Sequence, residues 1–229
     1  MGAQGSQGQL DVVLFRYIFG GAIAVPGSSY VNYLMPGIMV QSVILGSAFT
    51  GIGMATDLQR GLVDRFRSLP MSASAVLSGR ILADLGRSAF IVLIVWVVGL
   101  AVGFQPAGTP LDWLAATGLL LLGSLVFAWL SALLGLVLSS VEAVQQAFVI
   151  WALPLMFASS ALVPTNTMAD WLRPFVEHQP VTLLINAIRS LLLGQPDATS
   201  IWQTVAWCVG LLAVLVPLAV WAYGRRTAR

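Results

Sequence analysis

The chain has 229 residues, of which 58% are hydrophobic and only 9% are charged. Soluble domains carry about 25% charged residues, so this chain has too little polar surface to enclose a water-soluble core. The composition therefore indicates an all-α integral membrane protein, which we treat as a single domain over residues 1–229. Eleven arginines and nine acidic residues give a net charge of +2. The chain has no lysine, which excludes a lysine-dependent phosphate loop for ATP hydrolysis.

The first apolar run covers residues 12–25 and is shorter than the roughly 20 residues that a helix needs to cross a bilayer. It contains Arg16 and ends at Pro26-Gly27. We expect it to be a truncated first span whose beginning lies upstream of this chain, or else an interfacial segment.

Five longer apolar runs follow, and we expect spans at residues 33–56, 81–104, 113–138, 143–163 and 201–223. The run at 143–163 is long enough to cross the bilayer only if its polar start lies in the membrane interface. Ser139 and Glu142 there form a capping box pattern, which favours a structural role for Glu142. Asp84 and Arg87 are one turn apart near the start of the 81–104 span, so we expect them to pair at its cytoplasmic edge.

Five arginines lie between Asp57 and Arg87, in an island between two apolar runs. Thr56-Asp57-Leu58-Gln59 has the pattern of a capping box, and Leu58, Leu62, Phe66 and Leu69 then recur at helical spacing. Pro70 ends the pattern, because the residue before a proline disfavours helical geometry. The residues predict a short amphipathic helix over 57–69. They fit docking to a soluble partner and anchoring on lipid headgroups equally well.

The orientation follows from the arginines, which concentrate on the cytoplasmic side of membrane proteins. Alternate loops place eight arginines on the side of the island and the C-terminus, and three (Arg16, Arg173 and Arg189) on the other side. We therefore expect residues 57–87 and the C-terminus to be cytoplasmic.

Residues 164–196 combine apolar helical pieces with four prolines, a pattern that predicts broken, re-entrant helices at the outer face. Arg189 lies in an otherwise apolar piece. The sequence is equally compatible with two roles for Arg189. It pairs with Glu177 or Asp170 and holds the re-entrant hairpin shut, or its guanidinium extends to water. We take Asp170, Glu177 and Arg189 as candidate outer-gate residues. His178 is the only histidine, so we expect a surface residue and no metal site.

Two blocks of sequence resemble the type-2 ABC exporter permeases, in particular the daunorubicin- and doxorubicin-resistance-like membrane subunits. The first is DLQRGLVDRFRSLP at 57–70, which is similar to the coupling-helix segment of that family. The second runs from FASSALVP at 157–164 through WLRPF at 171–175 and HQPVT at 178–182 to AIRSLLLG at 187–194. The resemblance covers nearly the whole chain from FRYIFGG at 15–21 onward.

The resemblance implies a six-span permease that dimerises, as a homodimer or a heterodimer, in the plasma (inner) membrane of a bacterium. It implies two separate ATPase subunits that bind ATP and magnesium, so that this chain holds no cofactor and is not itself an enzyme. Its partners would be the ATPase and membrane lipid, and not nucleic acid. The resemblance also implies that one set of residues contacts the ATPase: Arg60, Asp64, Arg65, Phe66, Arg67, Leu69 and Pro70.

The spans carry apolar side chains and keep their charges near their ends, which favours a lipophilic or amphipathic cargo such as a drug, an antibiotic or a lipid. Export of a polysaccharide or its lipid carrier by a permease of the same superfamily is an alternative. A secondary transporter is a second alternative, and it predicts ionisable residues near the middle of the membrane. Four aromatic residues are spaced through the spans: Trp96, Trp129, Trp151 and Phe157. Two uses fit them, lining of a cargo path and packing in the core, and we favour packing.

Overall fold

The structure is a computed structural model that describes residues 30–59, 73–138, 140–161 and 170–227. Within these ranges every regular element is an α-helix, which agrees with the expected all-α class. The helices are α2 (Tyr30–Gln59), α4 (Ala73–Ala101), α5 (Pro110–Val137), α6 (Val141–Phe157), α7 (Arg173–His178), α8 (Pro180–Leu192) and α9 (Ala198–Thr227).

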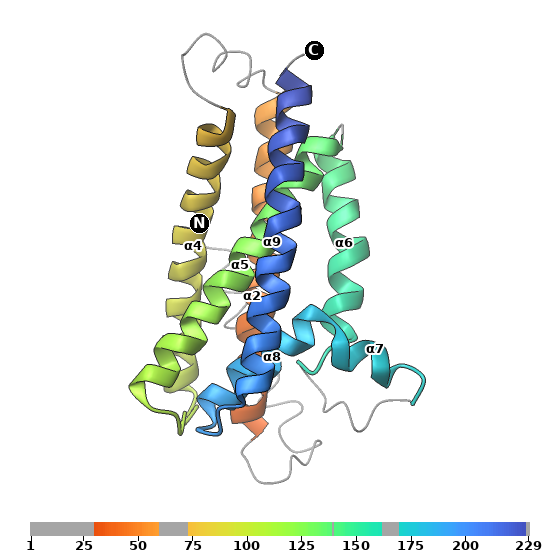
Figure 1. Ribbon diagram of the computed structural model, residues 1–229. Helices are drawn as coiled ribbons and strands as arrows, with labels where there is room; N and C mark the ends of the chain where they lie inside the picture. Colours follow the sequence, from red (N-terminus) through yellow and green to blue (C-terminus); the bar gives the residue numbers. More distant parts are fainter. Residues whose placement is uncertain (1–29, 60–72, 139, 162–169, 228–229) are drawn as a thin grey trace.

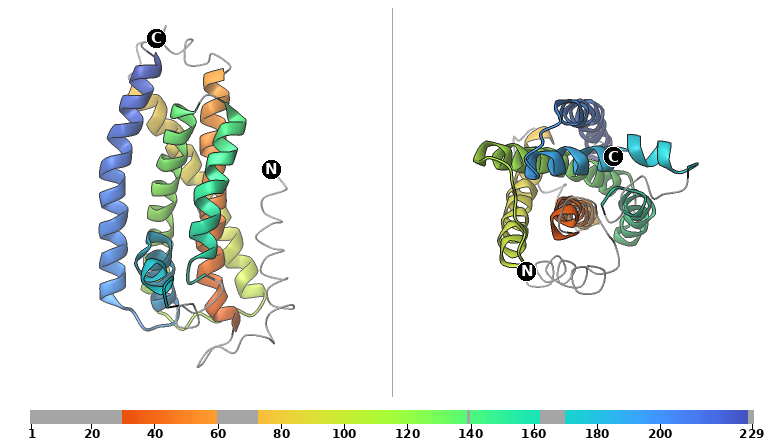
Figure 2. Two further views of the ribbon diagram at one scale, coloured as in Figure 1. Left: turned by 90° about the vertical axis from the view of Figure 1, so that its right-hand side faces the viewer. Right: turned by 90° about the horizontal axis from the view of Figure 1, so that it is seen from below.

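The helices form a bundle with two distinct ends (Figure 1). The end of α2, the start of α4, the α5–α6 junction and the last turns of α9 lie together at one end, which we call the C-terminal end. The α4–α5 connection and the short helices α7 and α8 lie at the opposite end, which we call the α8 end. Seen along the bundle, α2 is viewed nearly down its axis, whereas α7 and α8 lie across the end of the bundle (Figure 2).

Four of the described helices are long and apolar enough to cross a membrane: α2, α4, α5 and α9. In α2 and α5, 61% of the most apolar stretch is buried within the chain, against 22% in α4 and α9. The first two are therefore the centre of the bundle, and the last two present apolar side chains outward, as lipid-facing helices do.

Four of the expected apolar runs lie in long helices whose bounds differ from those expected: α2, α4, α5 and α9. The run at 143–163 differs from these four. The 143–163 run forms a helix that ends at Phe157, where the N–H of Ala158 bonds the carbonyl of Pro154. Its 17 residues are fewer than a full crossing needs. The 164–196 region does contain two short helices, α7 and α8, whereas the partial span at 12–25 lies outside the described residues.

Two expected helix caps are corrected. Thr56 does not begin a new helix, because α2 continues through it to Gln59 and its hydroxyl donates to the carbonyl of Ile52 at 2.8 Å. The cap of α6 is Ser140 and not Ser139, since Ser140 Oγ accepts from the N–H of Ala143 at 3.1 Å.

Small residues bring α2 and α5 close together, as the glycines and serines of α2 predict. Ser47 and Ser131 share a hydrogen bond of 3.2 Å. One helical turn further along, a Cβ on Gly51 would meet the carbonyl of Ser131, and a Cβ on Gly135 would meet the carbonyl of Gly51. Backbone approach of this kind excludes any side chain at Gly51 and Gly135.

Aromatic rings fill the bundle at three of the four positions considered for a cargo path. Trp96 stacks on Trp113 with ring centroids 5.5 Å apart, and Trp151 stacks on Phe127 at 6.0 Å. Trp129 is buried, whereas Phe157 is exposed at the end of α6. Core packing is therefore the observed use of the three tryptophans.

Candidate functional site

The seven residues that we assigned to the ATPase contact lie at 60–70, outside the described residues. The structure describes the two helices that flank this segment: α2 ends at Gln59 and α4 begins at Ala73. Both of these helix ends are at the C-terminal end of the bundle (Figure 1).

A polar network lies at the α8 end, among otherwise apolar side chains. It consists of Tyr33 from α2, Ser160 from the turn after α6, and Gln179, Thr182, Asn186 and Arg189 from α8 and its N-cap. Residues 179, 182, 186 and 189 are spaced by three or four positions, so they form one stripe on the helix. We call this set the α8 polar network.

Arg189 is the centre of the α8 polar network. Its Nη2 donates to the carbonyl of Ser160 at 2.7 Å and to the carbonyl of Tyr33 at 3.2 Å, and its Nη1 donates to Asn186 Oδ1 at 2.9 Å. The guanidinium also lies 3.8 Å from the centroid of the Tyr33 ring, within the range of a cation–π contact. One side chain thus connects α2, the turn after α6, and α8.

Neutral groups complete the network. The hydroxyl of Tyr33 donates to the carbonyl of Ser160 at 3.1 Å, and Ser160 Oγ donates to Asn186 Oδ1 at 2.9 Å. Gln179 donates to the carbonyl of Ala158 and to Thr182 Oγ1. Because carbonyls satisfy the guanidinium, the positive charge is held without a carboxylate in contact among the described residues.

The expected pairing of Arg189 with Glu177 or Asp170 is wrong. Glu177 instead accepts from Arg173 Nε at 2.7 Å, one turn earlier on α7. This hydrogen bond, with the charge of Glu177, raises the pKa of Arg173, and the charge of Asp170 contributes less. The two carboxylates therefore face the exposed Arg173, while Arg189 turns into the bundle. Extension of Arg189 to water is wrong too, because its guanidinium donates to Tyr33, Ser160 and Asn186 inside the bundle.

His178 is exposed on α7, and a ring nitrogen lies 2.8 Å from the carbonyl of Pro174. The prediction of a surface histidine is confirmed. Among the described residues no group of three His, Cys, Asp or Glu side chains has the arrangement of a metal site.

The expected pair of Asp84 and Arg87 is confirmed at 3.0 Å, but its position is not the edge of a span. Because α4 begins at Ala73, Arg87 lies fourteen residues from either end of the helix. Its Nη2 donates to the carbonyl of Gly46 at 2.9 Å, and Gly46 is itself near the middle of α2. Charged side chains therefore lie deeper in the bundle than the sequence suggested.

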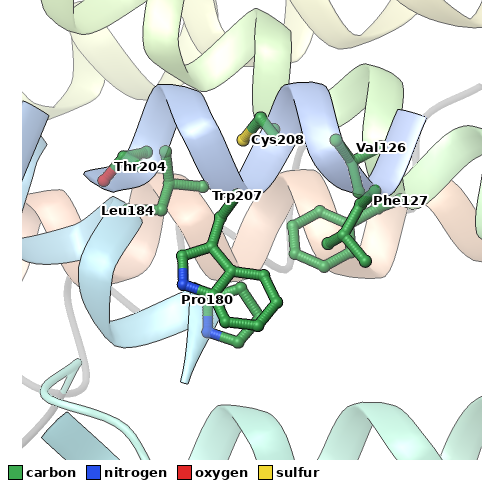
Figure 3. Close-up of a pocket in the computed structure, with 9 residues that line it drawn as sticks. Val126, Phe127, Pro180, Leu184, Thr204, Trp207 and Cys208 are labelled. Carbon is green, nitrogen blue, oxygen red and sulfur yellow. The ribbon is translucent and has the colours of Figure 1, made fainter. Parts of the chain in front are cut away.

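An apolar pocket opens between α5, α8 and α9 (Figure 3). Leu184 and Pro180 of α8 face Phe127 of α5 and Trp207 of α9 across it. Its one hydroxyl, of Thr204, already donates to the carbonyl of Ser200 at 2.8 Å. The pocket thus offers a surface for hydrocarbon groups and none for an ion.

The sequence did not single out Tyr33, Ser160 or Asn186, which hold Arg189. Their residue types are common, and they come from three separate segments, so only the fold brings them together. The signal that was available is the spacing of Gln179, Thr182, Asn186 and Arg189 on one face of an apolar helix.

Four long apolar helices, together with two short helices across one end of the bundle, define the class: a multi-pass α-helical membrane protein. Residues 7–193 match the ABC-2 type transporter family. The chain belongs to this family, whose members include permease proteins of ABC transporters.

Two relatives show how far the similarity extends. The chain is 32% identical over 217 residues to the daunorubicin resistance ABC transporter permease protein DrrB1 of Streptomyces coeruleorubidus, which covers 95% of this chain and 77% of the relative. It is 26% identical over 204 residues to the doxorubicin resistance ABC transporter permease protein DrrB of Mycobacterium tuberculosis, covering 89% of this chain and 68% of that protein. The family expected from the two sequence blocks is thereby confirmed.

Proposed function

We propose that this chain is the membrane permease of an ATP-driven exporter that moves a lipophilic or amphipathic compound out of the cell. The observation that carries the proposal is its similarity, over nearly its whole length, to permeases named for daunorubicin and doxorubicin resistance.

In this proposal ATP and magnesium bind to a separate ATPase subunit at the C-terminal end of the bundle. Phe66 and Leu69 would be apolar anchors, with Arg60, Asp64, Arg65, Arg67 and Pro70 around them, since interface anchors are apolar side chains rimmed by polar ones. Support comes from the two flanking helices, which end at the same end of the bundle.

The C-terminal end faces the cytoplasm of a bacterium in this proposal, and the permease works as a dimer. The arginines support the orientation, because Arg60, Arg65 and Arg67 belong to the α2–α4 connection and Arg225, Arg226 and Arg229 to the C-terminus. The α8 end would then face outward, and the α8 polar network would form part of the outer gate.

The test replaces Phe66 with alanine. We expect Phe66→Ala to lower co-purification of the ATPase at least about tenfold, the effect of removing an interface anchor worth 1.4 kcal/mol or more. Phe90→Ala is the matched control. It removes the same phenyl group, but from an exposed position on the outward face of α4. Full co-purification of Phe66→Ala would contradict the docking assignment.

The mid-helix pair of Asp84 and Arg87 is the one observation that favours a secondary transporter, since such carriers place ionisable groups inside the membrane. The two alternatives differ in their energy source. In proteoliposomes holding permease and ATPase, we expect cargo export to require ATP and to continue after an ionophore collapses the ion gradients. Export that stops with the ionophore and ignores ATP would establish the secondary transporter.

A further inference from the structure

Four charged side chains form a line along the contact between α2 and α4. Arg80 of α4 forms an ion pair with Asp57 near the end of α2. One turn further along α4, Asp84 binds Arg87 at 3.0 Å, and Arg87 donates to the carbonyl of Gly46 at 2.9 Å. We call Asp57, Arg80, Asp84 and Arg87 the α2–α4 charge ladder.

The ladder reaches far from the helix ends. Arg87 is fourteen residues from both Ala73 and Ala101, which is about 21 Å at 1.5 Å per residue. Arg87 lies within the stretch Ser78–Ala101, which is long and apolar enough to cross a membrane, and a charge inside such a stretch needs partners within the protein. Arg87 has them in Asp84, the Gly46 carbonyl and the face of the Phe49 ring at 5.4 Å.

One glycine of α2 makes room for the ladder, since a Cβ on Gly53 would overlap the guanidinium of Arg80. Gly46 lies seven residues earlier, on the same face of α2, and meets the ladder through its carbonyl, which accepts from Arg87. This face of α2 thus meets the charged face of α4 at two points.

The ladder is not fully satisfied in this conformation. Asp84 Oδ2, Arg80 Nε and Arg87 Nε are buried atoms without a hydrogen-bond partner among the described residues. A buried polar atom without a hydrogen-bond partner destabilises the conformation that leaves it so. Asp84 is four residues after Arg80 on the same helix, so its free oxygen is within reach of Arg80 after a change of side-chain rotamer.

We propose that Arg80 and Arg87 are positioning residues for transport, and that α4 shifts against α2 as Arg80 exchanges Asp57 for the free oxygen of Asp84. In the conformation described, Arg80 ties α4 to α2. In the second conformation Arg80 binds within α4, and among the ladder residues Arg87 alone still bonds α2. The role in transport rests on the proposed function, whereas the exchange itself does not.

The experiment measures the distance between α2 and α4 in the full chain in lipid nanodiscs by electron spin resonance. Spin labels are placed by Leu45→Cys on α2 and Leu93→Cys on α4, both exposed positions, with Cys208→Ala to remove the native thiol. We expect two distance populations with the ladder intact. Asp57→Asn should raise the population in which Arg80 binds Asp84 about three- to fivefold. Asp84→Asn should deplete that population by a similar factor, as expected for loss of a partly exposed ion pair.

A single population with the ladder intact, or the same distribution in both variants, overturns the exchange. The single-population outcome needs no ladder variant, so it decides even if a variant fails to fold. Arg80→Lys keeps the cation and should retain both populations.

The transport role is tested separately by cargo moved per ATP hydrolysed in proteoliposomes with the ATPase. We expect Asp84→Asn to lower this ratio about three- to fivefold, matching its shift in population. An unchanged ratio overturns the positioning role. Absence of any ATP-dependent transport by the unaltered chain overturns the proposed function instead, and leaves the distance result standing.

Discussion

Arg189 shows how one side chain can join three segments at the α8 end. Its guanidinium bonds the carbonyls of Tyr33 and Ser160 and the side chain of Asn186. Each of these acceptors lies in apolar surroundings, where loss of a donor is expensive. The arrangement is specific to arginine, whose planar fork of donors can bond several acceptors at fixed angles, unlike the point charge of lysine.

We expect Arg189→Gln to destabilise the chain by about 1–3 kcal/mol, because it removes the charged hydrogen bonds to the carbonyls of Tyr33 and Ser160 and to the side chain of Asn186. Thermal unfolding in detergent measures the loss. Amide hydrogen exchange at residues 158–161 should accelerate as well, since the turn after α6 loses its connection to α8. Arg189→Lys should restore only part of the stability.

The matched control is Arg173→Gln on α7. Arg173 is an exposed arginine paired with Glu177 at 2.7 Å, and an exposed pair contributes less than about 1 kcal/mol. Equal loss of stability in the two variants would mean that Arg189 is not the brace that its contacts indicate.

Among the elements, the contact of α2 with α5 is the most extensive in the bundle. Membrane helices gain little from excluding water from one another, so close packing of small residues carries much of their association. Gly51 and Gly135 place the two backbones in direct contact, and the hydrogen bond of Ser47 to Ser131 lies one turn away.

We expect Gly135→Ala to destabilise the bundle by about 1–3 kcal/mol, the usual cost of overfilling a packed contact. Gly118→Ala is the control on the same helix, because a Cβ at Gly118 meets nothing within 4 Å. That change should be neutral or slightly stabilising, since alanine favours a helix over glycine by about 0.5–1 kcal/mol. Identical unfolding temperatures for the two variants would refute the close contact of α2 with α5.

At the scale of the whole molecule, the two ends of the bundle differ in chemistry. Both α2 and α9 end at the C-terminal end, and three arginines follow α2 in the sequence while three close α9 and the chain. The α8 end carries the crossing helices and the α8 polar network. A membrane protein inserted by the distribution of its positive charges would keep the first end in the cytoplasm.

Labelling of intact cells tests this orientation. In a Cys208→Ala background, we expect a membrane-impermeant thiol reagent to label Gln195→Cys at the α8 end and to leave Gln59→Cys at the C-terminal end unlabelled. Both positions are exposed. After the cells are opened, both should react. The reverse pattern in intact cells would invert the orientation.

Much of the fold was predictable because membrane insertion depends on local composition. Runs of apolar residues predicted α2, α4, α5 and α9, and the prolines after residue 163 predicted broken helices before α9. Boundaries were predicted less well. Thr56 has the residue pattern of a helix start, yet α2 continues through it to Gln59, since a helix that is already formed can extend through a local start signal.

The sequence by itself determined the class of protein, its family and its four long apolar helices, because each of these depends on residues that are near one another in the chain. Only the tertiary structure decided the partners of the charges. Arg189 turns inward to carbonyls from two distant segments, and Arg87 meets the middle of α2, since a buried charge must find its hydrogen-bond partners wherever the packing of helices brings them.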